Sequence, residues 1–163
     1  MNFKNHINNI VDFPQPGIIF RDIQPILENP DVFRRAIQSM GKLVIKPDLW
    51  VGIESRGFIF AAALAAQFGG GVKLIRKKGK LPPNNLNTVK YNLEYGSDSL
   101  QMEKGNDLKK VVIVDDVLAT GGTIKAAETL CLKGNYEVTD KLVLIDIMIS
   151  DISNEVKSLI QYG

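Results

Sequence analysis

The chain has 163 residues, a net charge of +2, one cysteine and one histidine. This length suits a single domain, residues 1–163, and so small a charge argues against a general nucleic-acid binder. The lone Cys131 excludes an internal disulfide, and with His6 as the single histidine there is no cluster for zinc or a His-activated nucleophile. No signal-peptide pattern and no apolar run of membrane-spanning length is evident, which predicts a cytoplasmic protein without membrane contact. Any catalysis must therefore use carboxylates, cations and backbone amides.

Short runs rich in Val, Ile and Leu recur along the chain, and Gly-containing loops and segments with helical spacing follow them. Strands are predicted at 49–53, 72–75, 111–114 and 142–149, and helices at 58–68 and from the end of the 115–122 loop to Gly134. This order predicts an α/β fold with an open, mostly parallel twisted sheet flanked by helices. Ligands of such sheets bind where loops leave the carboxyl ends of the strands, so we expect the site at 54–57, 76–80 and 115–123.

Residues 89–102 follow a different pattern, because apolar and polar side chains alternate there with a period of two. This predicts a flexible β-hairpin that covers the ligand edge of the sheet, with its turn at 96–98 and a mobile loop, 82–87, leading into it.

The segment 111–123, VVIVDDVLATGGT, contains the strongest functional signal. A buried strand delivers two adjacent carboxylates, Asp115 and Asp116, to the sheet edge, where they can accept hydrogen bonds from both hydroxyls of a sugar diol. The small, Gly-rich residues that follow can wrap a phosphate at the start of the next helix. Together they describe a site for a ribose 5-phosphate. A polar turn with a helix cap is the alternative, whereas the Walker A and Gly-x-Gly-x-x-Gly patterns are missing.

Segment 111–123 resembles the phosphoribosyl diphosphate signature of type I phosphoribosyltransferases. Four further blocks, 13–23, 52–58, 74–82 and 91–96, look like the adenine phosphoribosyltransferases in that family's order, and the likeness extends from about residue 12 to the terminal LIQY. Two segments depart from the family pattern: residues 88–91 of the hairpin, and residues 135–151, which are shorter than usual.

The resemblance implies a role for each block. It gives the ribose to Asp115 and Asp116, and the 5-phosphate to Ala119, Thr120, Gly121, Gly122 and Thr123. The diphosphate falls to a loop of Glu54, Ser55 and Arg56, where the family has an unusual non-proline peptide geometry, and to the cations Arg76, Lys77 and Lys80, partly across a dimer interface. Adenine falls to an N-terminal hood segment, Ile19, Phe20 and Arg21. Glu94 becomes the acid/base of the flexible hairpin, with Tyr95 beside it.

The implied reaction is purine salvage, in which adenine and 5-phosphoribosyl 1-diphosphate give AMP and diphosphate in a homodimer. Mg²⁺ would be held mainly by substrate oxygens and water, with no dedicated protein ligands. A phosphoribosyltransferase for 6-oxopurines would share 111–123 but have a different N-terminal block. A nucleotide-sensing regulator on the same fold would need an added DNA-binding domain or a basic face.

Overall fold

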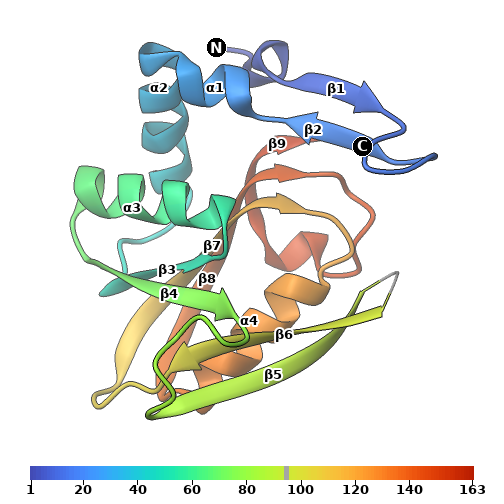
Figure 1. Cartoon of the computed structure of the whole chain (residues 1–163). Helices are drawn as coiled ribbons and strands as arrows, with labels where there is room; N and C mark the ends of the chain where they lie inside the picture. Colours follow the sequence, from blue (N-terminus) through green and yellow to red (C-terminus); the bar gives the residue numbers. More distant parts are fainter. Residues whose placement is uncertain (94–95) are drawn as a thin grey trace.

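A computed structural model describes residues 1–93 and 96–163 of the chain (Figure 1). The helices within these residues are η1 (Phe3–His6), α1 (Gln24–Glu28), α2 (Pro30–Gly41), α3 (Arg56–Phe68), α4 (Gly122–Lys133) and η2 (Ser153–Glu155). The strands are β1 (Asn8–Val11), β2 (Ile19–Asp22), β3 (Leu49–Ile53), β4 (Gly71–Lys77), β5 (Leu86–Leu93), β6 (Gly96–Glu103), β7 (Lys109–Leu118), β8 (Tyr136–Asp146) and β9 (Lys157–Gln161).

Seven strands form one sheet in the order β5-β6-β4-β3-β7-β8-β9, and β1 and β2 pair in a separate antiparallel hairpin. The strands from β4 through β3, β7 and β8 to β9 are all parallel, whereas β5 and β6 are antiparallel additions at one end. The predicted fold class, an open and mostly parallel α/β sheet flanked by helices, is confirmed. Its parallel topology places the ends of β3, β4 and β7 at a common edge.

Several predicted boundaries were wrong. β7 continues to Leu118, so both aspartates still lie in the strand, and β8 spans 136–146 in place of 142–149. Residues 137–140 are exposed or only partly buried, so this part of β8 lacks the continuous apolar run that predicts a fully buried strand. The predicted hairpin turn at 96–98 is paired strand, with Asp98 opposite Tyr91, and the loop predicted at 82–87 already becomes β5 at Leu86.

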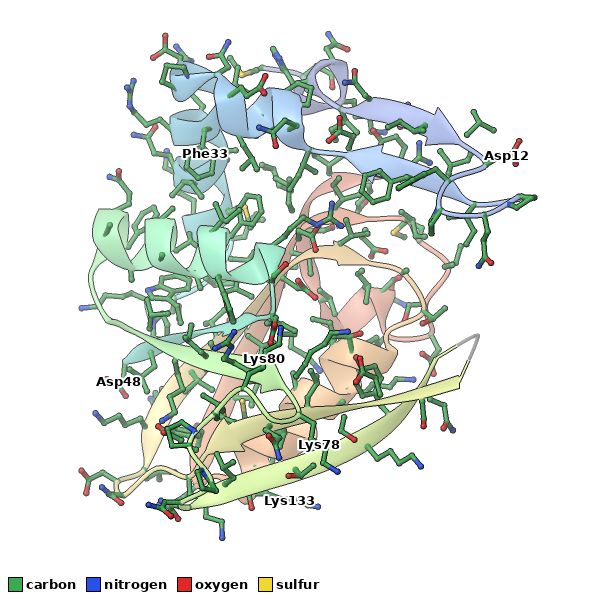
Figure 2. The ribbon with its side chains drawn as sticks, in the orientation of Figure 1. Asp12, Phe33, Asp48, Lys78, Lys80 and Lys133 are labelled. Atoms are coloured by element: carbon green, nitrogen blue, oxygen red, sulfur yellow. The ribbon has the colours of Figure 1, made fainter. Side chains whose placement is uncertain are left out.

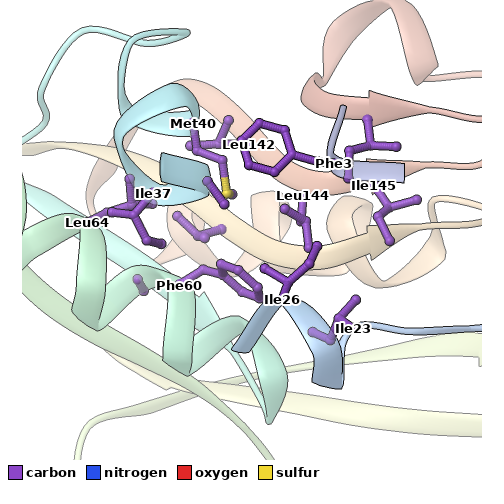
Figure 3. Close-up of a cluster of buried hydrophobic side chains, with 14 of the residues drawn as sticks. Phe3, Ile23, Ile26, Ile37, Met40, Phe60, Leu64, Leu142, Leu144 and Ile145 are labelled. Carbon is purple, nitrogen blue, oxygen red and sulfur yellow. The ribbon is translucent and has the colours of Figure 1, made fainter. Parts of the chain in front are cut away.

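Apolar side chains cover both faces of the sheet. On one face α2 and α3 enclose a cluster that includes Phe60, Met40 and Leu144 (Figure 3). On the other face α4 and the β5–β6 hairpin enclose a second cluster, which contains Cys131. Burial raises the pKa of the Cys131 thiol to about 12, so this residue stays a neutral thiol in the core. Among the described residues no helix has the length and apolar character needed to cross a membrane.

The β1–β2 hairpin lies beside β9, at the edge of the main sheet (Figure 1). Every residue of β1 is exposed, and the hairpin is flanked by the buried residues Ile7 and Ile23. Neither this hairpin nor β9 was predicted as a strand, because their short sequences lack a period. The hairpin carries Ile19, Phe20 and Arg21 into the neighbourhood of the main sheet.

Replacing Phe60 by Ala should lower the free energy of unfolding by about 3–5 kcal/mol, because the fully buried ring leaves a cavity between α2 and α3. Urea unfolding followed by circular dichroism measures this change. Ile45→Ala is the control: Ile45 is 85% exposed, and its replacement should change stability by less than about 0.5 kcal/mol. Equal losses in the two variants would contradict the packing described for α3.

Candidate active site

A cavity of about 470 Å³ opens at the carboxyl ends of β3, β4 and β7. It unites residues from all three loops that the sequence singled out. The lining residues are Glu54, Ser55, Arg56, Lys77, Lys80, Tyr91, Leu100, Asp115, Asp116 and Thr123. Tyr91 and Leu100 were not predicted as site residues; they belong to the β5–β6 hairpin, which therefore forms one wall of the cleft.

The two neighbouring acids, Asp115 and Asp116, are buried at the end of β7, and Arg56 is the cation beside them. Asp115 Oδ1 accepts a hydrogen bond from the Asp116 backbone amide at 2.9 Å. Arg56 Nε lies 2.7 Å from Asp116 Oδ2, but the contact lacks hydrogen-bond alignment, so we describe it as an ion pair. The first residue of α3 thus compensates the charge of the acid pair.

Burial is the main reason why the pKa of the Asp115 carboxyl lies well above its ordinary value, and the adjacent Asp116 charge adds to it. Gly57 allows this close packing. A β-carbon on Gly57 would lie 2.7 Å from the Val114 carbonyl oxygen and 3.0 Å from Asp115 Oδ1. Arg56 therefore supplies a positive charge next to the acids, and Gly57, the residue after it, leaves the space that they need.

Glu54 lies among cations at the end of β3. Its Oε1 accepts a hydrogen bond from Lys80 Nζ at 2.6 Å, and its Oε2 accepts one from the Lys77 backbone amide at 2.7 Å. Arg76 Nε is 3.5 Å from Oε2. Burial alone would raise the pKa of the Glu54 carboxyl, but the hydrogen bonds from Lys80 and Lys77 and the nearby positive charges outweigh it and lower the pKa. Glu54 thus orients Lys77 and Lys80, at and after the end of β4. Lys80 is labelled in Figure 2.

The peptide bond between Glu54 and Ser55 is cis, a geometry that fits the unusual peptide implied for this loop by the family resemblance. Lys77 and Lys80 both line the cavity, whereas Arg76 does not. Arg76 donates instead to the Lys80 carbonyl oxygen at 3.3 Å. Within one chain, the predicted diphosphate cluster therefore presents two of its three cations to the cleft.

The predicted phosphate loop, residues 119–123, encloses a smaller cavity of about 70 Å³. Thr123 lines both this cavity and the larger one, so the two are neighbours. Gly121 has a φ of 92°, in the region that favours glycine, and α4 begins at the next residue without a side-chain cap. The first amides of α4 are therefore left for an anion. Ser150 Oγ donates to the Thr120 carbonyl oxygen at 3.0 Å and supports the loop from behind.

The β5–β6 hairpin is tied to the cation loop by Lys77 Nζ, which lies 2.6 Å from Asp98 Oδ2. Burial raises the pKa of the Tyr91 hydroxyl, and the Asp98 charge acts in the same direction, so this hydroxyl remains a neutral group in the cavity wall. Glu94 and Tyr95, predicted as the acid/base and its neighbour, lie outside the described residues.

The predicted base segment, Ile19, Phe20 and Arg21, does not line the larger cavity. Phe20 nevertheless reaches its rim, because the Arg56 guanidinium lies 5.2 Å from the centre of the Phe20 ring. Ile19 is half-exposed, and the Arg21 side chain contacts Asn9 and Tyr162. Arg56 therefore joins the N-terminal hairpin to the acid pair.

Sequence reasoning missed Gly57, Tyr91 and Leu100 as parts of the site. Tyr91 and Leu100 follow the period-two pattern that predicts the hairpin, but that pattern does not tell which face meets the cleft. Within the described residues, no group of three or more His, Cys, Asp or Glu side chains could by itself hold a metal ion.

Glu54→Gln should destabilise the protein in a pH-dependent way. A carboxyl whose pKa is lowered on folding stabilises the fold above its ordinary pKa, here 4.5, and loses that effect as the pH falls through its folded value. The stability difference between wild type and Glu54→Gln should thus be largest near neutrality and shrink below about pH 4.5.

Chemical unfolding between pH 3 and pH 7 measures this difference. In a Lys80→Met background the effect of Glu54→Gln should be smaller, because the hydrogen bond from Lys80, which lowers the pKa of Glu54 most, is gone. A difference that stays constant over this pH range would contradict the ion-pair account of Glu54.

Comparisons with known proteins agree with this geometry. A phosphoribosyl transferase domain model matches residues 25–148. An adenine phosphoribosyltransferase of Carboxydothermus hydrogenoformans is 44% identical over 173 residues, which cover 99% of this chain and 100% of that protein. The crystal structure of the Thermoanaerobacter pseudethanolicus adenine phosphoribosyltransferase has a TM-score of 0.91 and 39% identity, with 98% of this chain and 97% of that chain covered. The Saccharomyces cerevisiae structure has a TM-score of 0.86 and 32% identity, with 97% and 94% covered. The chain therefore belongs to the adenine phosphoribosyltransferase family.

Proposed function

We propose that this chain transfers the ribose 5-phosphate of 5-phosphoribosyl 1-diphosphate to adenine, giving AMP and diphosphate in purine salvage. The carrying observation is that a buried acid pair lines one cleft together with Lys77 and Lys80. Through Thr123 this cleft adjoins the smaller cavity of the Gly-rich loop at the start of α4. Acids for a diol with two neighbouring features suited to anions match a sugar that carries a diphosphate and a phosphate.

The ribose belongs at Asp115 and Asp116. Their carboxylate oxygens lie at the end of β7, from where they can accept hydrogen bonds from the two ring hydroxyls. The 5-phosphate then falls to Ala119, Thr120, Gly121, Gly122 and Thr123, where backbone amides and the helix dipole favour negative charge. The close spacing of acids and loop in the sequence sets the distance between diol and phosphate.

The diphosphate belongs beside Lys77, Lys80 and Arg56, with the Glu54 carboxylate orienting the lysines. The few carboxylates in the cleft fit Mg²⁺, which usually binds through one or two carboxylates together with substrate phosphates and water. Asp115 and Asp116 are the residues that would hold it, directly or through water. When bound, Mg²⁺ would neutralise charge on the departing diphosphate.

Bond breaking between the anomeric carbon and the diphosphate oxygen leaves the electron pair on diphosphate and positive charge on the sugar. The carboxylates next to the ring favour this oxocarbenium-like state. N9 of the base then bonds to the anomeric carbon, while Glu94 accepts the proton that N7 gives up. Such general base catalysis is worth about 10²–10⁴-fold in rate. The hairpin keeps water from the activated sugar when it closes over the cleft.

The base itself would lie between the N-terminal hairpin and the cleft, next to Ile19 and Phe20. Phe20 is in reach of Arg56, and an aromatic ring beside a guanidinium suits a flat purine. Support also comes from the Saccharomyces cerevisiae relative, which was solved as a complex with adenine and an imino-altritol bisphosphate. Arg21 would contribute through its backbone, because its side chain is engaged elsewhere.

A homodimer fits the outer edge of β4. Only Arg76 and Lys77 of this strand pair with β6, and the apolar Ile59, Val72 and Leu74 are 40%, 39% and 38% exposed. Val72 and Leu74 share the face of the sheet that α3 covers, and Arg76 continues that row. A second copy at this edge would cover the apolar row and approach Arg76.

We infer a single domain and a cytosolic compartment. Both core clusters pack on the same seven-stranded sheet, which favours one phosphoribosyltransferase domain over residues 1–163. A cytosolic location is favoured by the single cysteine, Cys131, which is buried and unpaired.

The direct test is an assay of the purified protein with Mg²⁺ and phosphoribosyl diphosphate, offered adenine, hypoxanthine, guanine and xanthine in parallel. AMP and diphosphate should form in equal amounts with adenine, and the other bases should react far more slowly. A preference for hypoxanthine or guanine would move the protein to the 6-oxopurine enzymes, and no product with any base would refute the proposal.

Glu94→Gln should lower kcat with adenine by at least about tenfold, because a glutamine side chain cannot accept the N7 proton. The groups proposed to bind the diphosphate and the 5-phosphate are unchanged in this variant. The KM for phosphoribosyl diphosphate should change little. Glu103→Gln is the matched control, since Glu103 lies on the same hairpin, pairs with Lys73 and does not line the cleft. Unchanged turnover in Glu94→Gln would remove this residue from the mechanism.

Leu74→Glu should convert the dimer to a monomer, because it places a charge in the apolar row on β4. Sedimentation velocity measures the change in mass, and Leu132→Glu is the control, since Leu132 is exposed on α4. A Leu74→Glu protein with the sedimentation coefficient of the wild type would contradict the proposed interface.

A further inference from the structure

The Tyr162 ring connects the end of the main sheet with the N-terminal hairpin. Arg21 Cζ lies 4.0 Å from the centre of this ring, and Lys4 Nζ lies 4.9 Å from it. Both distances are within the range of a cation–π interaction. We use the name Tyr162 clamp for this contact of Tyr162 with Arg21 and Lys4.

The sheet holds Tyr162 firmly. Its backbone amide donates to the Asp146 carbonyl oxygen at 2.9 Å, directly after β9 pairs with β8. The ring packs against the first hydrophobic cluster. β8 in turn pairs with β7, where Val143 is the partner of Asp115. A short path through two strands therefore leads from the clamp to the acid pair.

The other side of the clamp, Arg21, lies on a hairpin that the buried residues Ile7 and Ile23 anchor at its two ends. Its Nη1 donates to Asn9 Oδ1 across the hairpin, and its buried Nε has no hydrogen-bond partner among the described residues. All β1 side chains are exposed. Between the two anchored ends, the Tyr162 ring is a contact that holds β2 against the sheet.

Phe20 is the residue that links this contact to the cleft. It precedes Arg21 in β2, and neighbouring strand residues point to opposite sides. While Arg21 is stacked on Tyr162, the Phe20 ring lies 5.2 Å from the Arg56 guanidinium. Arg21 on Tyr162 and Phe20 beside Arg56 are therefore contacts of adjacent residues on the same strand.

We infer that Tyr162 is a positioning residue for the base: it fixes the β1–β2 hairpin so that Ile19 and Phe20 form the adenine side of the cleft. This inference rests on the proposed transferase function. The ring face carries the effect. The Tyr162 hydroxyl is buried without a hydrogen-bond partner among the described residues, so it contributes nothing to the contact.

The test compares Tyr162→Leu with Tyr162→Phe. Tyr162→Leu removes the ring, and the KM for adenine should rise about 3- to 30-fold while kcat and the KM for phosphoribosyl diphosphate stay within about twofold. Tyr162→Phe keeps the ring and should match the wild type in all three constants. Arg21→Met removes one cation from the other side of the clamp, and in this background Tyr162→Leu should cause no further rise in the KM for adenine.

Hydrogen exchange supplies a readout that needs no activity. The amides of β1 and β2 should exchange faster in Tyr162→Leu than in Tyr162→Phe, while those of β7 and β8 stay the same. This result would support the clamp even if the wild type made no AMP, an outcome that would count against the transferase function alone. An unchanged KM for adenine with unchanged hairpin exchange would overturn the inference. An equal rise of the KM for adenine and of the KM for phosphoribosyl diphosphate in Tyr162→Leu would overturn it as well.

Discussion

The ion pair between Arg56 and Asp116 is the interaction on which the rest of the site depends. Two adjacent carboxylates in the interior are costly unless a cation or a shared proton compensates them, and Arg56 supplies the cation from the first turn of α3. The same guanidinium faces Phe20 of the N-terminal hairpin. One side chain thus contacts both the acid pair at the end of β7 and the N-terminal hairpin.

The part of the fold that could be predicted is the part with strong local signals. The continuous apolar runs of β3 and β7 are readable without a structure, because burial on both faces of the sheet demands them. The glycine that ends α4 is readable because glycine commonly follows the last turn of a helix. The β1–β2 hairpin and β9 could not be predicted. Their strands have only four or five residues each, and their pairing is decided by other segments rather than by a period in their own sequence.

The candidate site also has a part that the sequence predicts and a part that it does not. The acid pair and the Gly-rich loop are contiguous in the sequence, so their joint position is set by one strand and one helix start. The environment of Glu54 is not contiguous, since its partners Lys77 and Lys80 lie more than twenty residues further on. The family resemblance implies that Glu54 belongs to the diphosphate loop, whereas its contacts show that it orients the cations Lys77 and Lys80. The Tyr162 clamp joins Tyr162 to Lys4 and Arg21, which are more than a hundred residues away in the sequence, so no local pattern predicts it.

We propose that Asp115, Asp116 and the loop behind them bind one ribose 5-phosphate. A crystal structure of the protein with AMP is the decisive measurement. We expect the 5-phosphate against the amides of residues 119–123, both ribose hydroxyls within hydrogen-bond distance of the two aspartates, and the purine next to Phe20. A nucleotide bound elsewhere, with this cleft empty in the same crystal, would contradict it.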